Sequence, residues 1–149
     1  MWHSTKIYLF VVLSLWCSLF AKADRPKNFP STSIWTSVWD TEVNDVAFKK
    51  VGNKLQENLT VEELVLILNK TLFLDIEVVG LESETLKIKI NDSETLTEHM
   101  GSSGAKTCLG IITFTLTENS QVKMVDMDFE YGSHASPGVY SRINFIQAF

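Results

Sequence analysis

Two runs of alternating apolar and charged residues lie on either side of a short turn between Leu72 and Ile90. The alternating apolar positions are Leu74, Ile76, Val78, Leu86, Ile88 and Ile90. Such alternation indicates strands with one buried face and one solvated face. An antiparallel register that pairs Val78 with Leu86 puts these apolar side chains on one face and sets Glu77 opposite Lys87. The segment therefore predicts a β-hairpin.

Burial fixes this register more strongly than charge does. Oppositely charged pairs across strands contribute about 0.2–1 kcal/mol each, whereas fully burying one large apolar side chain contributes about 1.5–3 kcal/mol. A slip of one residue would turn the charges toward the core. We interpret the pattern as architecture and not as a chemical site.

A second hairpin is expected from residues 106–118 and 121–131, joined by Asn119-Ser120. A two-residue connection pairs Phe114 with Val125 and again collects apolar side chains on one face. A fifth strand is predicted over residues 138–149, where apolar and polar residues alternate. Small-residue-rich loops are expected over 98–106 and 132–138.

Helices are expected before the first hairpin. Residues 43–55 carry apolar side chains at three- and four-residue spacing, after a possible cap at Asp40 or Thr41. Thr60 and Glu63 match a capping box that begins a second, shorter helix. The predicted fold class is α+β, with one or two N-terminal helices packed on a curved antiparallel sheet of four to five strands.

The first 23 residues resemble a secretory signal peptide. Lys6 precedes an uncharged apolar run over residues 7–20, and Ala21-Lys22-Ala23 fits a small-x-small cleavage site. The run is shorter than the roughly 20 residues that a membrane span needs. We expect cleavage before Asp24, an extended leader over residues 24–39, a single α+β domain over 40–149, and a secreted, extracellular protein without a membrane span.

The net charge narrows the class of partner, and the sequons indicate where glycans could be attached. The chain carries a formal charge of −5, which argues against nucleic acid as a partner. Three Asn-X-Ser/Thr sequons, at Asn58, Asn69 and Asn91, are candidate N-glycosylation sites in a secreted chain.

Cys108 is the only cysteine that remains after removal of the signal peptide, so no internal disulfide is possible. Its strand register points toward the core, which predicts a buried thiol. The alternative is an intermolecular disulfide that links two copies into a homodimer.

The sequence carries no recognisable reaction centre. His99 and His134 are isolated in predicted loops, and neither a metal-ligand cluster nor a phosphate-binding or hydrolase motif occurs. We expect no catalytic residues, no metal and no cofactor. The candidate partner contacts are Trp35, Trp39, Gly80, Asn119 and Ser120, which are aromatic residues of the leader and turn residues of the hairpins.

The segment Ile76-Glu77-Val78-Val79-Gly80 lies at the first hairpin, after a helix, and in this respect the chain is similar to the cystatin fold. Cystatins place a QxVxG protease-binding loop there; Ile76 replaces the Gln, and the Pro-Trp of the second hairpin is absent. The resemblance implies a cystatin-like topology over about 80 residues and inhibition of papain-type cysteine proteases.

The expected function is that of a secreted, N-glycosylated, non-catalytic binding protein whose partner is a protein or a small apolar ligand. A cystatin-like inhibitor is the alternative. A small secreted enzyme with a pocket between helix and sheet is the third interpretation.

Overall fold

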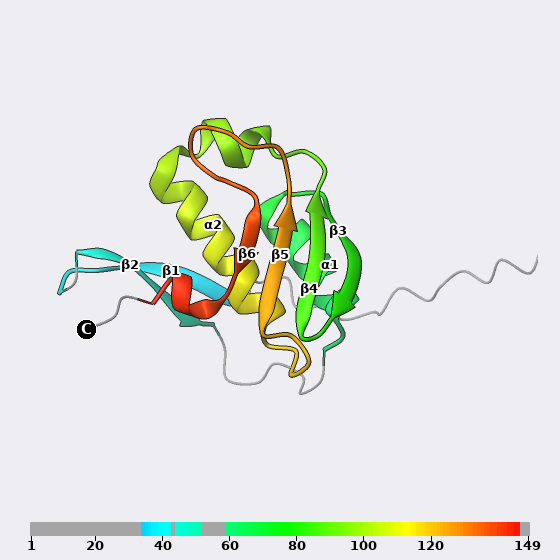
Figure 1. The fold of residues 1–149 in the computed structure, drawn as a ribbon. Helices are drawn as coiled ribbons and strands as arrows, with labels where there is room; N and C mark the ends of the chain where they lie inside the picture. The colour runs from blue at the N-terminus through cyan, green and yellow to red at the C-terminus, as the bar shows by residue number, and fades with distance from the viewer. Residues whose placement is uncertain (1–33, 43, 52–58, 147–149) are drawn as a thin grey trace, which may run out of the picture.

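A computed structural model describes residues 34–42, 44–51 and 59–146. The predicted signal peptide, most of the leader and the Asn58 sequon lie outside these residues. Figure 1 shows the elements in chain order. They are β1 (Trp35–Asp40), β2 (Asp45–Lys50), α1 (Val61–Leu72), β3 (Ile76–Glu82), β4 (Thr85–Ile90), the π-helical turn η1 (Thr95–His99), α2 (Gly101–Leu116), β5 (Met124–Asp128), β6 (Gly138–Tyr140) and the 3₁₀ turn η2 (Arg142–Asn144).

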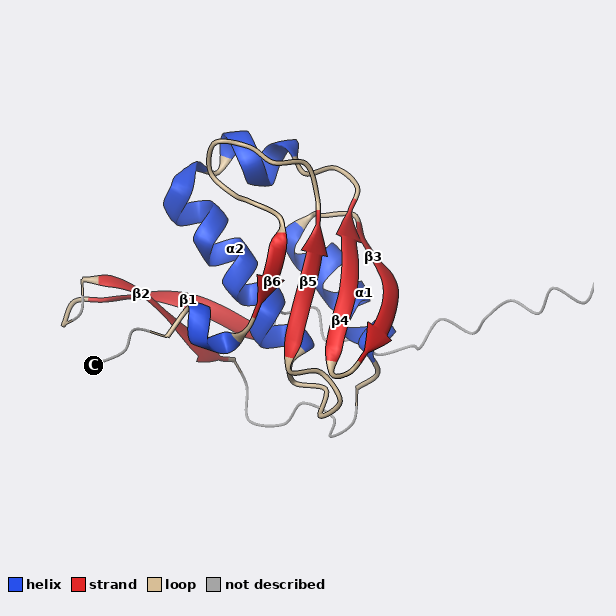
Figure 2. Cartoon of the chain, in the orientation of Figure 1, coloured by secondary structure: helices blue, strands red, loops and turns tan. Residues whose placement is uncertain are grey.

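The main sheet has four strands in the order β3-β4-β5-β6. The β3–β4 and β5–β6 pairs are antiparallel, whereas β4 and β5 run parallel. Both long helices lie against one face of the sheet (Figure 2). The side chains of Ile76, Ile88 and Met127 are buried on that face, while Lys89 and Asp128 are exposed on the other.

The β3–β4 hairpin is confirmed, but its register is wrong by two residues. Ile76 pairs with Ile90 and Val78 pairs with Ile88, and Glu77 lies opposite Lys89. The faces are unchanged because a shift of two residues preserves the alternation. The turn, which pairs Glu82 with Thr85, sets the observed register, and an irregularity between Val78 and Gly80 then shifts the pairing by one residue.

The largest correction concerns residues 106–118, which were expected to form a strand and instead belong largely to α2. The β-branched residues and the apolar run favour a strand locally. However, α2 is buried on two sides, by the sheet and by the β1–β2 ribbon, so both of its faces are apolar (Figure 1). A helix buried in this way loses the one-sided periodicity that identifies amphipathic helices. The predicted second hairpin is wrong for the same reason. The loop expected over 98–106 is also wrong, because this small-residue segment contains the end of η1 and the first turns of α2.

The helix expected over residues 43–55 is also wrong where the structure describes it. Asp45–Lys50 forms β2, which pairs with β1 in an antiparallel ribbon. Asn44 adopts a positive φ of 53° in the connection, a conformation that asparagine tolerates better than most residues. Ile34 is 1% exposed, so the expected boundary between leader and domain at residue 40 falls within packed structure.

Helix α1 begins as predicted. The Thr60 hydroxyl accepts a hydrogen bond from the Glu63 amide, and the Glu63 carboxylate accepts one from the Thr60 amide. The helix ends at Leu72, and the residue that follows it, Phe73, has a left-handed φ of 55°. Asn69 then fixes the following strand, because its side-chain amide both donates to and accepts from the backbone of Ile76 (2.9 and 2.8 Å).

The expected fifth strand over residues 138–149 is shorter than predicted: β6 has three residues and η2 follows it. The α+β class is confirmed, with a mostly antiparallel four-stranded sheet and a separate two-stranded ribbon. The cystatin-like topology is not confirmed, because α2 separates β4 from β5 and the two strands are parallel.

Candidate functional site

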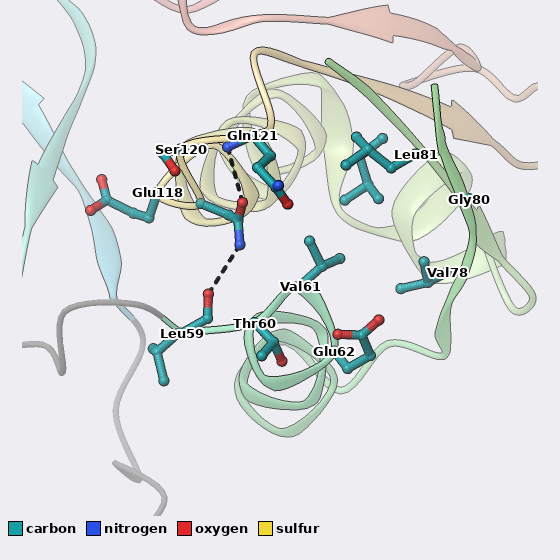
Figure 3. A pocket seen from close by; sticks show the side chains of 12 residues that line it. Leu59, Thr60, Val61, Glu62, Val78, Gly80, Leu81, Glu118, Ser120 and Gln121 are labelled. Carbon is teal, nitrogen blue, oxygen red and sulfur yellow. Dashed lines mark hydrogen bonds between the residues drawn. The ribbon is translucent and has the colours of Figure 1, made fainter. Parts of the chain in front are cut away.

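A hollow of about 530 Å³ opens at the end of the sheet where β3 ends and β5 begins. Three segments surround it: the start of α1, the β3–β4 hairpin and the connection from α2 to β5 (Figure 3). Its lining residues are Leu59, Thr60, Val61, Glu62, Val78, Gly80, Leu81, Leu86, Glu118, Asn119, Ser120 and Gln121.

The hollow presents polar and apolar surface in equal measure. Val61 extends from the first turn of α1 into the space, and Val78 and Leu81 border it from β3 (Figure 3). Leu86 also lines the hollow, from β4, and is 1% exposed. Val61, Val78 and Leu81 present aliphatic surface to anything that enters, whereas Leu86 is almost fully covered by the protein.

One wall of the hollow is fixed by Asn119. Its side-chain amide donates to the Leu59 carbonyl (3.1 Å), and its carbonyl oxygen accepts from the Gln121 amide (3.1 Å). The first bond links the connection after α2 to the residue that precedes the cap of α1. The Gln121 side chain points into the hollow and offers a donor and an acceptor (Figure 3).

Glu118 borders the hollow, but its carboxylate points away, toward the β1–β2 ribbon (Figure 3). It accepts hydrogen bonds from Trp35 Nε1 (3.1 Å), from Arg142 (2.8 Å) and from Lys50. Partial burial raises the pKa of Glu118, but the hydrogen bonds from Lys50 and Arg142 outweigh it, so the pKa lies below the usual value. The charge of Glu118 is therefore compensated within the protein.

Glu62 differs from Glu118 in this respect. It is exposed at the mouth of the hollow and makes no ion pair with any residue that the structure describes. Among the described residues, the lining includes no lysine, arginine or histidine. The hollow thus combines aliphatic side chains, neutral polar groups and one carboxylate that no described residue compensates.

The predicted contact residues divide into two groups. Gly80, Asn119 and Ser120 all line the hollow, although Gly80 is far from the other two in sequence. Trp35 is connected to this region through its hydrogen bond to Glu118, and Trp39 lies on the ribbon with 60% of its surface exposed.

The other nine lining residues, among them Val61, Glu62 and Gln121, were not expected as contact residues from the sequence. The Thr60 capping box located the start of α1 and so the chain positions of Val61 and Glu62. Their place beside β3 depends on tertiary packing, and no local signal pointed to Gln121.

Cys108 is buried, as predicted, and is 3% exposed. Burial raises the pKa of its thiol to about 12, so the nucleophilic thiolate is suppressed. An intermolecular disulfide would require this thiol to leave the core.

A serine and a histidine are in contact elsewhere, at the start of α2. Ser102 Oγ lies 3.2 Å from His134 Nδ1, and both residues are exposed or half-buried. Glu98, the neighbouring acid, bonds to Ser133 and not to the imidazole, which lowers the pKa of Glu98. The pair therefore lacks the orienting acid of a nucleophilic triad. In the described ranges, no three potential metal ligands gather.

The two described sequons differ in their surroundings. Asn91 is exposed, and its amide nitrogen lies 3.2 Å from the Asp75 carboxylate. Asn69 is half-buried, and its amide is engaged with Ile76. Occupancy of the sequons stays a prediction.

A scan against models of known protein families, a search of curated proteins and a search of solved structures each found no match. None of the helices in the described part of the chain has the length and apolar character that a bilayer crossing requires.

Proposed function

We propose that this protein is a secreted, N-glycosylated, non-catalytic binding protein that holds a small apolar molecule in the hollow between α1, β3 and the α2–β5 connection. The observation that supports the proposal most directly is the hollow itself. Its volume of about 530 Å³ lies within the range of roughly 300–1,000 Å³ of small-molecule sites. Aliphatic side chains with a few convergent polar groups are the usual lining of such sites.

The rigidity of the surrounding walls supports this function. The capping box fixes the start of α1, and Asn119 connects the opposite wall to Leu59. A preformed site loses little conformational freedom when a ligand binds, which favours affinity. The lining offers polar groups that orient a ligand, and we assign it no reaction.

A neutral fluorescent probe, N-phenyl-1-naphthylamine, tests the proposal. We expect its fluorescence to rise on titration with the protein and to saturate at one probe per chain. Val61→Phe fills the hollow and should weaken binding about tenfold or more. Val139→Phe is the matched control, because Val139 is 54% exposed on β6, away from the hollow. Circular dichroism checks that both variants fold. Absence of saturable binding, or equal loss in both variants, would contradict the proposal.

A protein partner is the second candidate, and one observation favours it. Gly80 and the Asn119-Ser120 turn lie around the same hollow, at one end of the molecule, as a cystatin-like inhibitor of papain-type proteases requires. A steady-state papain assay separates the two functions. If the protein inhibits papain and Gly80→Trp abolishes the inhibition, the inhibitor function is favoured. If papain keeps full activity at micromolar concentrations of the protein, the inhibitor function is excluded.

A further inference from the structure

We infer that the ligand of the hollow is cationic, an apolar molecule carrying an amine or a quaternary ammonium group that pairs with Glu62. This inference rests on the proposed function and specifies the chemical class of the ligand. It follows from the distribution of charge around the hollow.

Two carboxylates border the hollow, and only one of them is available to a ligand. Glu118 is held by Lys50, Arg142 and Trp35 on the ribbon side. The Glu62 carboxylate extends from α1 toward Val78, at the mouth of the hollow (Figure 3). Since no described residue of the lining has a basic side chain, an ammonium group finds a partner at Glu62 and meets no repulsion from these residues.

The start of α1 does not reverse this preference. A helix N-terminus carries a partial positive charge that attracts anions. Here the Glu63 and Thr60 amides are taken by the capping box, and two acidic residues, Glu62 and Glu63, occupy the first turn. The Val61 and Glu62 backbone amides are not part of the capping box, but a carboxylate ligand near them would approach two formal negative charges.

The aliphatic part of the lining can contact the rest of the ligand. Val61, Val78 and Leu81 offer contact to an alkyl or aromatic body, and Gln121 can bond to a polar group near the head. Apolar burial then supplies most of the affinity, whereas the ion pair at the mouth decides between head groups of opposite charge.

The test compares three ligands with the same alkyl chain, octylammonium, octanol and octanoate, by displacement of N-phenyl-1-naphthylamine at low ionic strength. We expect octylammonium to bind most tightly and octanoate least. Glu62→Gln should weaken octylammonium about two- to fivefold, as expected for one exposed ion pair, and leave octanol unchanged. Added salt should reduce the preference.

Reversing the charge at residue 62 tests the inference in the opposite direction. Glu62→Lys should favour octanoate over octylammonium, while Glu130→Gln, which removes a charge beyond the far end of β5, should leave the order unchanged. If the probe binds but octanoate equals or exceeds octylammonium, the inference fails and the proposed function stands. If the probe does not bind at all, both fail.

Discussion

The guanidinium of Arg142 lies over the indole ring of Trp35, 5.2 Å from its centroid. The same group lies 5.1 Å from the centroid of the Phe114 ring. Arg142 also donates to the Phe114 carbonyl (3.1 Å) and to Thr117 Oγ (2.7 Å), so it satisfies groups at the C-terminal end of α2. One side chain after β6 thus joins the ribbon, the helix and the wall of the hollow that contains Glu118.

Loss of this junction should destabilise the protein. We expect Arg142→Ala to lower the free energy of unfolding by about 1–3 kcal/mol, because it removes a cation–π contact and several charge-assisted hydrogen bonds. Arg142→Lys should recover only part of the loss, since an ammonium group cannot reproduce the planar fork. Urea denaturation measures the free energy of unfolding of both variants. Lys123→Ala is the control, and an equal effect of all three changes would contradict the assigned role.

The low pKa of Glu118 predicts a pH-dependent contribution to stability. The folded pKa lies below the unfolded value, which is about 4.3 for glutamate. The stabilisation is therefore present above the unfolded pKa and is lost as the pH falls through the folded pKa. The difference in free energy of unfolding between the wild type and Glu118→Gln should be largest near neutral pH and shrink as the pH falls below the unfolded value. A pH-independent difference would show that the carboxylate charge is irrelevant.

Gly110 allows the ribbon to approach α2. A methyl group at this position would overlap the Phe48 ring, so Gly110→Ala should destabilise the protein by about 1–3 kcal/mol despite the better helix propensity of alanine. Gly80→Ala is the matched control, because nothing lies within 4 Å of the position that its added methyl group would take. Combining Gly110→Ala with Phe48→Leu should restore part of the stability in thermal unfolding. Additive losses in that double variant would argue against the contact.

Cys108 should be inert in the native protein. With a buried thiol and a pKa of about 12, we expect negligible reaction with Ellman's reagent at mildly alkaline pH and complete reaction in guanidinium chloride. Ser103→Cys, in a Cys108→Ala background, provides an exposed thiol for comparison. Rapid labelling of native Cys108, or a dimer on a non-reducing gel, would instead support the intermolecular disulfide.

The sequons should differ in occupancy in a glycosylating host. Asn91 is exposed and should carry a glycan, whereas the Asn69 amide holds the Ile76 backbone and should carry less. Intact mass should fall by one glycan in Asn91→Gln and change little beyond the substitution itself in Thr71→Ala, which removes the Asn69 sequon. The opposite pattern would mean that the Asn69 contact tolerates a sugar.

The sequence by itself determined the elements that depend on interactions between residues close together in the chain. The alternation around Ile76 and Ile88 predicted a hairpin with the correct buried face, and Thr60 with Glu63 predicted the start of α1. In each case neighbouring residues supply the deciding interaction, either a cross-strand pair or a capping hydrogen bond.

Tertiary structure decided the conformation of α2 and β2 and the formation of the hollow. Most of residues 106–118 form a helix because the sheet and the ribbon bury it from both sides, and this removes the polar face that would have distinguished it from a strand. Asp45–Lys50 forms a strand because β1 pairs with it and Phe48 packs over Gly110. The hollow could not be predicted as a unit, since its walls come from three segments far apart in the chain. Periodicity reports whether a residue is buried; which partner buries it depends on contacts that the sequence alone does not specify.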